Sequence, residues 1–302
     1  MEEAGIRSFC LALPSSLLTG AGLLLWHRSG VLKPQEWHGT EGGTWETALW
    51  SFAAVECIRL FVVLTLPVWW YKVAKREKEL TREVHETCGV QVTSMVASLV
   101  TLSGLAMADF TFTTELPFLH MTKGSTSGGM YQHLSVFLLV YVLSDTSHLL
   151  RTWRLVPNPA MLIHHIIFTY ILVAGATHPQ QMEHYHIHAI LFTAEISTPF
   201  LNSRWLLRNI FMYKGKALPA VCNLAFASLF TLSRMVLYAA LCWDLCKMRS
   251  ELNFPTAAFQ DTFAVAVCAS YVLNAHWFSL IVKAILKPAA PKGKGSPKAK
   301  TI

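Results

Sequence analysis

Two apolar segments in the middle of the chain carry ionisable side chains among aliphatic neighbours. Asp145 lies near the end of segment 131–148, and His164 and His165 open segment 161–173. A short basic turn joins the segments, which predicts a helical hairpin. The carboxylate lies about six residues before the turn and the imidazoles about five after it, at about 1.5 Å per residue. We therefore expect the three side chains to lie at one depth on facing helices.

The chemistry that these residue types predict is acyl transfer. A neutral histidine acts as a general base near physiological pH or as a nucleophile, and a nearby carboxylate can orient it. The expected depth suits an acyl-CoA donor whose head stays in water while its chain enters the bundle. Ionisable residues at membrane depth cost roughly 2.5–3.5 kcal/mol each on insertion scales, which favours a functional role. Interhelical hydrogen bonding, worth about 0.6 kcal/mol per group, is the alternative role for such residues.

Composition predicts an all-α integral membrane protein. The 302 residues are 53% hydrophobic and 14% charged, whereas soluble domains are about 25% charged. Several apolar segments reach the roughly 20 residues that a bilayer core requires. We expect a polytopic bundle of 7–8 transmembrane helices, with the eighth present if run 6–26 crosses the membrane. The expected spans after that run are 45–71, 90–108, the two helices of the hairpin 131–176, 188–207, 218–243 and 257–283.

The charge distribution predicts the topology. The net charge of +7 resides mainly in alternate short loops and in a C-terminal tail. The positive-inside rule produces this placement, so the C-terminus is expected in the cytosol and no nucleic-acid partner is expected. The predicted divisions are an N-terminal apolar helix with a polar connection (1–44), a transmembrane domain (45–288) and a disordered basic cytosolic tail (289–302). Glu56 and Arg59 share one helical face and are expected to neutralise each other.

Other predicted spans bring polar residues toward the level of the hairpin site. Asn202 lies near the cytosolic end of its span, and Asn274 and His276 lie in the cytosolic third of the last span. Glu195 lies deeper, near mid-membrane, and Arg234 is its expected counter-charge. Together these residues predict a polar interior that opens toward the cytosolic leaflet and binds or senses a lipid.

A di-iron oxygenase is the first alternative, because such membrane enzymes are also rich in histidine. His184 and His188 have a suitable spacing, but they precede a helix whose far end lies near His164 and His165. A helix of about 20 residues separates the groups by roughly 25–30 Å, too far for one metal centre. We expect no metal and no cofactor, apart from acyl-CoA as a co-substrate if the chain is an enzyme.

The C-terminal tail carries lysines at two positions that match a retrieval signal. Lys298 and Lys300 lie three and five positions from the carboxyl end of the sequence, as in dilysine signals read by vesicle coats. A generic basic tail attracted to anionic lipid is the alternative. The retrieval hypothesis predicts binding to coat proteins and residence in the endoplasmic reticulum membrane.

The order and spacing of three motifs resemble the TLC domain family. These motifs are Tyr-Val-Leu-Ser-Asp145, the pair His164-His165 and Phe230-Thr-Leu-Ser-Arg234, and the similarity covers roughly residues 45–288. The family includes ceramide synthases, translocon-associated proteins and a cargo receptor of the endoplasmic reticulum. The resemblance implies that the histidine pair would be catalytic in a ceramide synthase-like N-acyltransferase, supported by Asp145.

The segment after the histidine pair departs from the synthase pattern. Ceramide synthases carry an Asp-x-x-Asp pair there, whereas this chain has Glu195 and Thr198. The Glu-Ile-Ser-Thr-Pro-Phe form is similar to the non-synthase branch of the family, whose implied role is membrane lipid homeostasis. Three hypotheses follow: a lipid-binding homeostasis protein, an acyl-CoA-dependent N-acyltransferase, and a receptor for cargo between the endoplasmic reticulum and the Golgi.

Overall fold

The computed structural model describes residues 43–73, 82–107, 127–153, 157–177, 185–247 and 256–286. All regular secondary structure in these ranges is helical. The elements are α2 (Gly43–Val73), α3 (Arg82–Met107), α4 (Ser127–Thr152), α5 (Pro159–Thr177), α6 (Tyr185–Thr193), η3 (Ala194–Ser197), α7 (Thr198–Asn209), α8 (Ala217–Phe230), η4 (Thr231–Leu237), α9 (Tyr238–Lys247) and α10 (Ala257–Leu286).

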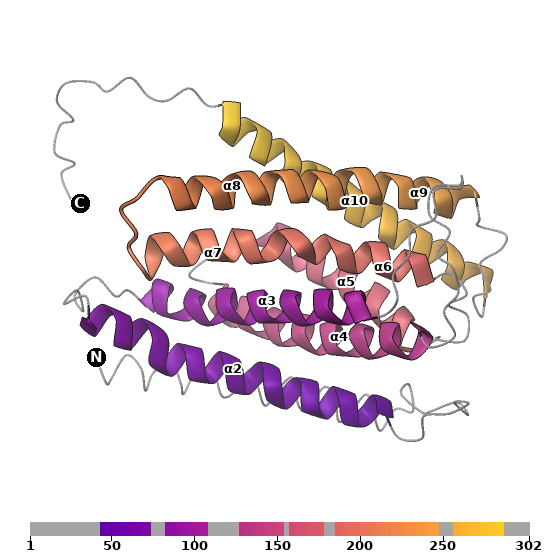
Figure 1. Cartoon of the computed structure of the whole chain (residues 1–302). Coiled ribbons are helices and arrows are strands. Elements are labelled where there is room, and N and C mark those ends of the chain that lie inside the picture. The colour runs from indigo at the N-terminus through magenta and orange to yellow at the C-terminus, as the bar shows by residue number, and fades with distance from the viewer. Residues whose placement is uncertain are drawn as a thin grey trace.

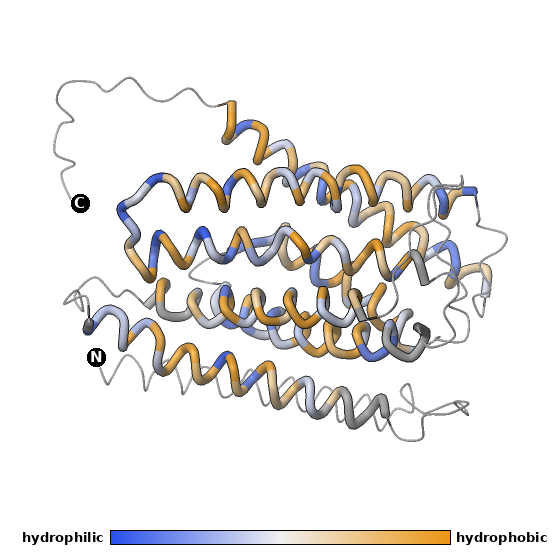
Figure 2. The backbone as a smooth tube through the Cα atoms, in the orientation of Figure 1, coloured by the Kyte–Doolittle hydropathy of each residue, from blue (hydrophilic) through white to orange (hydrophobic). Residues whose placement is uncertain are grey.

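The helices run side by side in one elongated bundle, with α10 crossing the others obliquely (Figure 1). Apolar residues predominate along their middle sections (Figure 2). The turn between α7 and α8, which carries Lys214 and Lys216, lies at the same end of the bundle as the C-terminal end of α10. The basic segments in the described ranges thus gather at one end, as the positive-inside pattern predicts.

Among the described residues, six helices are long and apolar enough to cross a membrane. They are Trp50–Lys72, Thr87–Ala106, Tyr131–Thr152, Pro159–Thr177, Ala217–Lys247 and Ala257–Leu286. The prediction of an all-α membrane protein is confirmed for the described residues. The expected span 188–207 corresponds to a helical path that is interrupted between α6 and α7, and run 6–26 lies outside the described residues.

The interruption between α6 and α7 follows from one residue type. Pro199 has no N–H, so the carbonyl of Glu195 lacks the donor that an α-helix would supply four residues later. The N–H of Thr198 turns to that carbonyl instead, which produces the 3₁₀ segment η3. The carbonyl of Ala194 therefore loses the donor that an uninterrupted helix would give it, and it becomes available to another element.

A second irregular segment lies opposite the first. The long helix 217–247 widens into a π-helix over η4, between α8 and α9. π-helical turns are rare and occur frequently at functional sites. Arg234 lies within η4, so Glu195 and its predicted counter-charge both stand on segments that depart from α-helical geometry.

Close helix contacts at glycines fix how the hairpin packs. A Cβ atom at Gly175 of α5 would come within 2.7 Å of both His188 Nε2 and Ser135 Oγ. Three helices, α4, α5 and α6, therefore meet at this point because no side chain separates them. The largest apolar core surrounds the contact and draws residues from α3, α4, α5, α6, α9 and α10.

Candidate functional site

The hairpin brings one histidine of the pair into contact with the predicted carboxylate. His165 is buried, and its Nε2 lies 3.3 Å from Asp145 Oδ2. Its Nδ1 lies 2.9 Å from the hydroxyl oxygen of Thr146, which itself lies 2.6 Å from the carbonyl of Val142. The single proton of the Thr146 hydroxyl goes either to that carbonyl or to His165 Nδ1, according to the tautomer of the ring. His165 is thus held from both sides of its ring.

The other histidine of the pair has different surroundings. His164 is half-buried and contacts Phe168, Trp277 and His165, with ring centroids 5.2, 5.3 and 5.8 Å away. The Trp277 contact is edge-on and comes from α10. No hydrogen bond from the His164 ring is found among the described residues, so its nitrogens are the available ones of the pair.

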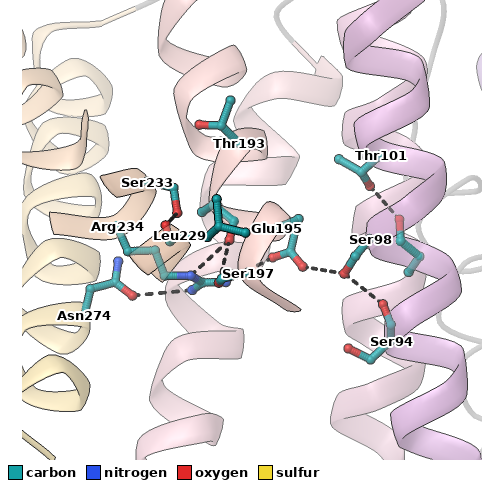
Figure 3. A network of polar contacts seen from close by, with 12 residues as sticks. Ser94, Ser98, Thr101, Thr193, Glu195, Ser197, Leu229, Ser233, Arg234 and Asn274 are labelled. Atoms are coloured by element: carbon teal, nitrogen blue, oxygen red, sulfur yellow. Dashed lines mark hydrogen bonds and ion pairs between the residues drawn. The ribbon is translucent and has the colours of Figure 1, made fainter. Parts of the chain in front are cut away.

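A second charged group lies where η3 faces η4 (Figure 3). Arg234 Nη2 lies 3.4 Å from Glu195 Oε1, and Arg234 Nε donates to the carbonyl of Ala194 at 3.1 Å. This carbonyl is the one that Pro199 releases from the helix. Arg234 Nη1 contacts the side-chain oxygen of Asn274 at 3.4 Å, and Ser98 donates to Glu195 Oε2 at 2.8 Å. The predicted pairing of Glu195 with Arg234 is confirmed.

Helix α10 contacts both groups, because Asn274 faces Arg234 and Trp277, one turn later, contacts the ring of His164. Tyr141 lies one turn before Asp145 on α4 and interacts electrostatically with both Asp145 and Glu195. His164 interacts in the same way with Arg234. The interior therefore holds a carboxylate–imidazole pair and a carboxylate–guanidinium pair. Together they offer hydrogen-bond donors and acceptors to a polar group inside the bundle.

A further polar cluster borders the site at the interface of α2 and α4. Glu56 and Arg59 form the ion pair predicted for span 45–71, and Ser144 donates to Glu56. One turn on, Arg151 Nη2 lies 2.6 Å from His148 Nδ1. Because Ser144 directly precedes the carboxylate of the hairpin site, this cluster fixes α2 against that site.

The remaining predicted residues do not all join the site. Asn202 is buried on α7, and its Nδ2 has no hydrogen-bond partner among the described residues. His276 is exposed on α10 and points away from the group that Asn274 joins. Lys298 and Lys300 lie outside the described residues. Within the described ranges, no three His, Cys, Asp or Glu side chains gather as a metal ion would require.

Four contacts of the site escape sequence reasoning. Ser98 and Thr146 are neutral residues in apolar helices, where a hydroxyl normally bonds to its own helix backbone. Trp277 resembles any aromatic residue on a lipid-facing helix. Tyr141 falls inside the quoted Tyr-Val-Leu-Ser-Asp motif, and its spacing of four residues from Asp145 was the available signal.

Comparison with protein families gives a match over most of the helical part of the chain. A family model described as the TLC domain matches residues 87–283. The match begins within α3 and ends within α10, so it contains both charged pairs and leaves α2 outside. Searches of the curated proteins and of the solved structures found no match.

Proposed function

The chain belongs to the TLC domain family, and from that membership we propose that it acts in membrane lipid homeostasis by binding a lipid inside its bundle. The polar part of the lipid would contact the site formed by Asp145, His164 and His165 on one side and Glu195 and Arg234 on the other. Its acyl chains would lie among the apolar helices. We place this activity in the membrane of the endoplasmic reticulum.

One observation carries this proposal: the contact between Asp145 and His165 and the ion pair between Glu195 and Arg234 both lie largely buried in one bundle, whose exterior carries many large apolar side chains. Burying charged pairs is no efficient route to stability, because desolvation offsets most of the attraction between them. Intramembrane ionisable residues that face a bundle interior commonly mark a path or a ligand site. The ring of His164, which lies beside His165 and has no hydrogen bond among the described residues, supports the same conclusion.

Co-purification of lipid tests the proposal. The full chain would be purified in mild detergent, and its bound lipids would be quantified by mass spectrometry beside the double variant Glu195→Leu/Arg234→Leu. We expect a lipid near equimolar with the wild type and loss of that lipid in the double variant. The same lipids in equal amounts in both proteins would show only annular lipid and would refute the proposed site.

An acyl-CoA-dependent N-acyltransferase is the second candidate, and the free ring of His164 favours it. In this reaction the imidazole accepts the proton of a lipid amine as the amine nitrogen attacks the thioester carbonyl. The carbon–sulfur bond breaks, and the proton passes to the leaving thiolate of CoA. His165 is held by Asp145 and Thr146, so it would fix the backbone of α5 next to it and thereby position His164, the base.

Microsomes that express the chain in cells without their own ceramide synthases test this candidate. Acylation of sphinganine by acyl-CoA would be measured beside the variant His164→Ala/His165→Ala at equal abundance. Turnover that depends on the pair would establish the acyltransferase. Turnover at background level would refute a ceramide synthase while leaving the lipid-binding proposal intact.

The cargo-receptor hypothesis depends on the C-terminal tail. A receptor that shuttles between compartments needs retrieval, and Lys298 and Lys300 would supply it by binding vesicle coat proteins. Retrieval is equally compatible with a resident lipid-binding protein. The tail therefore supports the location in the endoplasmic reticulum and does not separate these two functions.

A further inference from the structure

Asn274 combines complete burial with an unused donor. Its side chain is 1% exposed and stands on α10 beside Arg234 (Figure 3). The amide oxygen lies 3.4 Å from Arg234 Nη1, whereas the amide nitrogen Nδ2 has no hydrogen-bond partner among the described residues. Leaving a buried N–H donor without an acceptor is costly.

The orientation of this amide is decided by its neighbour. A guanidinium group has only donors, so the atom of Asn274 that faces Arg234 must be the oxygen. The nitrogen then points away from Arg234, and turning the amide over would bring two donors together. Arg234 is itself fixed by Glu195 and by the carbonyl of Ala194. The NH₂ group of Asn274 is therefore an oriented donor.

We propose that the Nδ2 group of Asn274 donates a hydrogen bond to the acyl carbonyl oxygen of the bound lipid, an inference that rests on the proposed function. A neutral acceptor fits better than a phosphate, because the charge of Arg234 is already paired with Glu195 at 3.4 Å. A carbonyl is the neutral acceptor that lies next to the apolar chains of a lipid. Glycerolipid esters and sphingolipid amides share it.

Competition between lipids with and without carbonyls tests this contact. The purified full chain would be labelled in detergent micelles with a photoactivatable diacyl phosphatidylcholine. Unlabelled diacyl phosphatidylcholine and its dialkyl ether analogue would compete, since the ether lacks both carbonyls. A photoactivatable ceramide would be used in parallel to test whether the carbonyl is that of a sphingolipid amide.

Variants of Asn274 show whether its side chain donates a hydrogen bond to the lipid or only supports the structure around Arg234. Asn274→Asp keeps an oxygen for Arg234 but cannot donate, and Asn274→Leu removes both functions at similar volume. Asn209→Leu is the matched control, because Asn209 lies at the end of α7 and its side chain, among the described residues, bonds only to its own helix. Melting temperature and monodispersity would be recorded for all three variants.

We expect the wild type to prefer the diacyl competitor by about fivefold to tenfold, as one hydrogen bond implies. Asn274→Asp and Asn274→Leu should both lose that preference, and Asn209→Leu should retain it. If only the ceramide labels the protein, loss of labelling in both Asn274 variants would support the amide as the source. Unchanged ceramide labelling would refute the contact.

Two results would overturn the inference in distinguishable ways. A wild type that binds diacyl and ether lipids equally, or an Asn274→Asp variant that keeps the preference, refutes the carbonyl contact and leaves lipid binding standing. A wild type labelled by neither probe refutes the inference together with the proposed function.

Discussion

The charged residues of the site depend on one another because each pair shares a buried location. Arg234 and Glu195 have side chains only 10% and 14% exposed. Removing one partner of a buried pair leaves a charge without compensation, whereas removing both leaves none. The same logic applies to Asp145 and His165, although Thr146 also contacts that imidazole.

The single variants Glu195→Leu and Arg234→Leu should each lower the free energy of unfolding by about 3 kcal/mol, because each leaves a buried charge. The double variant should be more stable than at least one of the singles, since no unpaired charge remains. Unfolding in detergent micelles measures all three. Losses of stability that simply add in the double variant would contradict the ion pair. Arg208→Leu is the control, because Arg208 is exposed on α7, and it should change stability by less than about 0.5 kcal/mol.

At the scale of elements, the site depends on two departures from α-helical geometry. The 3₁₀ segment η3 frees the carbonyl of Ala194, and the π-helical η4 carries the arginine that donates to it. Proline explains the first departure through its missing N–H. A change in the backbone hydrogen bonds of η3 should therefore alter the contact that Arg234 of η4 makes with the carbonyl of Ala194.

Pro199→Ala should restore the missing donor. The new N–H would bond to the carbonyl of Glu195, and the N–H of Thr198 would return to the carbonyl of Ala194. Hydrogen exchange followed by mass spectrometry should then show slower exchange in segment 194–199 than in the wild type.

Pro219→Ala is the control for this change. Pro219 stands in the first turn of α8, where the N–H has no partner within the helix, so exchange in segment 194–199 should not change. Equal exchange in Pro199→Ala and the wild type would show that the proline does not cause the 3₁₀ segment.

At the scale of the whole molecule, topology follows from where the basic residues gather. Lys214 and Lys216 lie at the same end of the bundle as the C-terminal end of α10, and the positive-inside rule predicts that this end faces the cytosol. The C-terminal end of α9 and the N-terminal end of α10 lie at the opposite end of the bundle (Figure 1).

Engineered glycosylation sites measure this orientation. An Asn-x-Thr acceptor in loop 248–255 should be glycosylated in microsomes, because that loop is expected in the lumen. The same acceptor in segment 210–216 should stay unmodified on the cytosolic side. The reverse pattern would invert the topology, and it would remove the tail from reach of cytosolic coat proteins.

Replacement of Lys298 and Lys300 by serine should move the protein from the endoplasmic reticulum to later compartments. The retrieval hypothesis gives the reason, since it has coat proteins read those two lysines. Microscopy of the full chain with an N-terminal tag measures the distribution. Lys292→Ser/Lys294→Ser keeps the two C-terminal lysines and should leave the location unchanged, whereas equal redistribution in both variants would indicate a general effect of basic charge.

Much of the architecture could be predicted because membrane spans are determined locally. Apolar length and loop charge place a helix in a bilayer whatever its neighbours are, so the expected spans lie close to the observed helices. The turn between residues 148 and 161 also fixes which helices face each other. Contact between Asp145 and His165, and the pairing of Glu195 with Arg234, follow from depth and charge.

Only the tertiary structure decided which face each polar residue presents. Asn274 and His276 are two positions apart on one helix, yet one is buried beside Arg234 and the other is exposed. Helix rotation about its axis is set by packing with neighbours, which a single sequence does not reveal. Likewise, Pro199 indicates a break, but the donor that uses the released carbonyl comes from η4, some forty residues later.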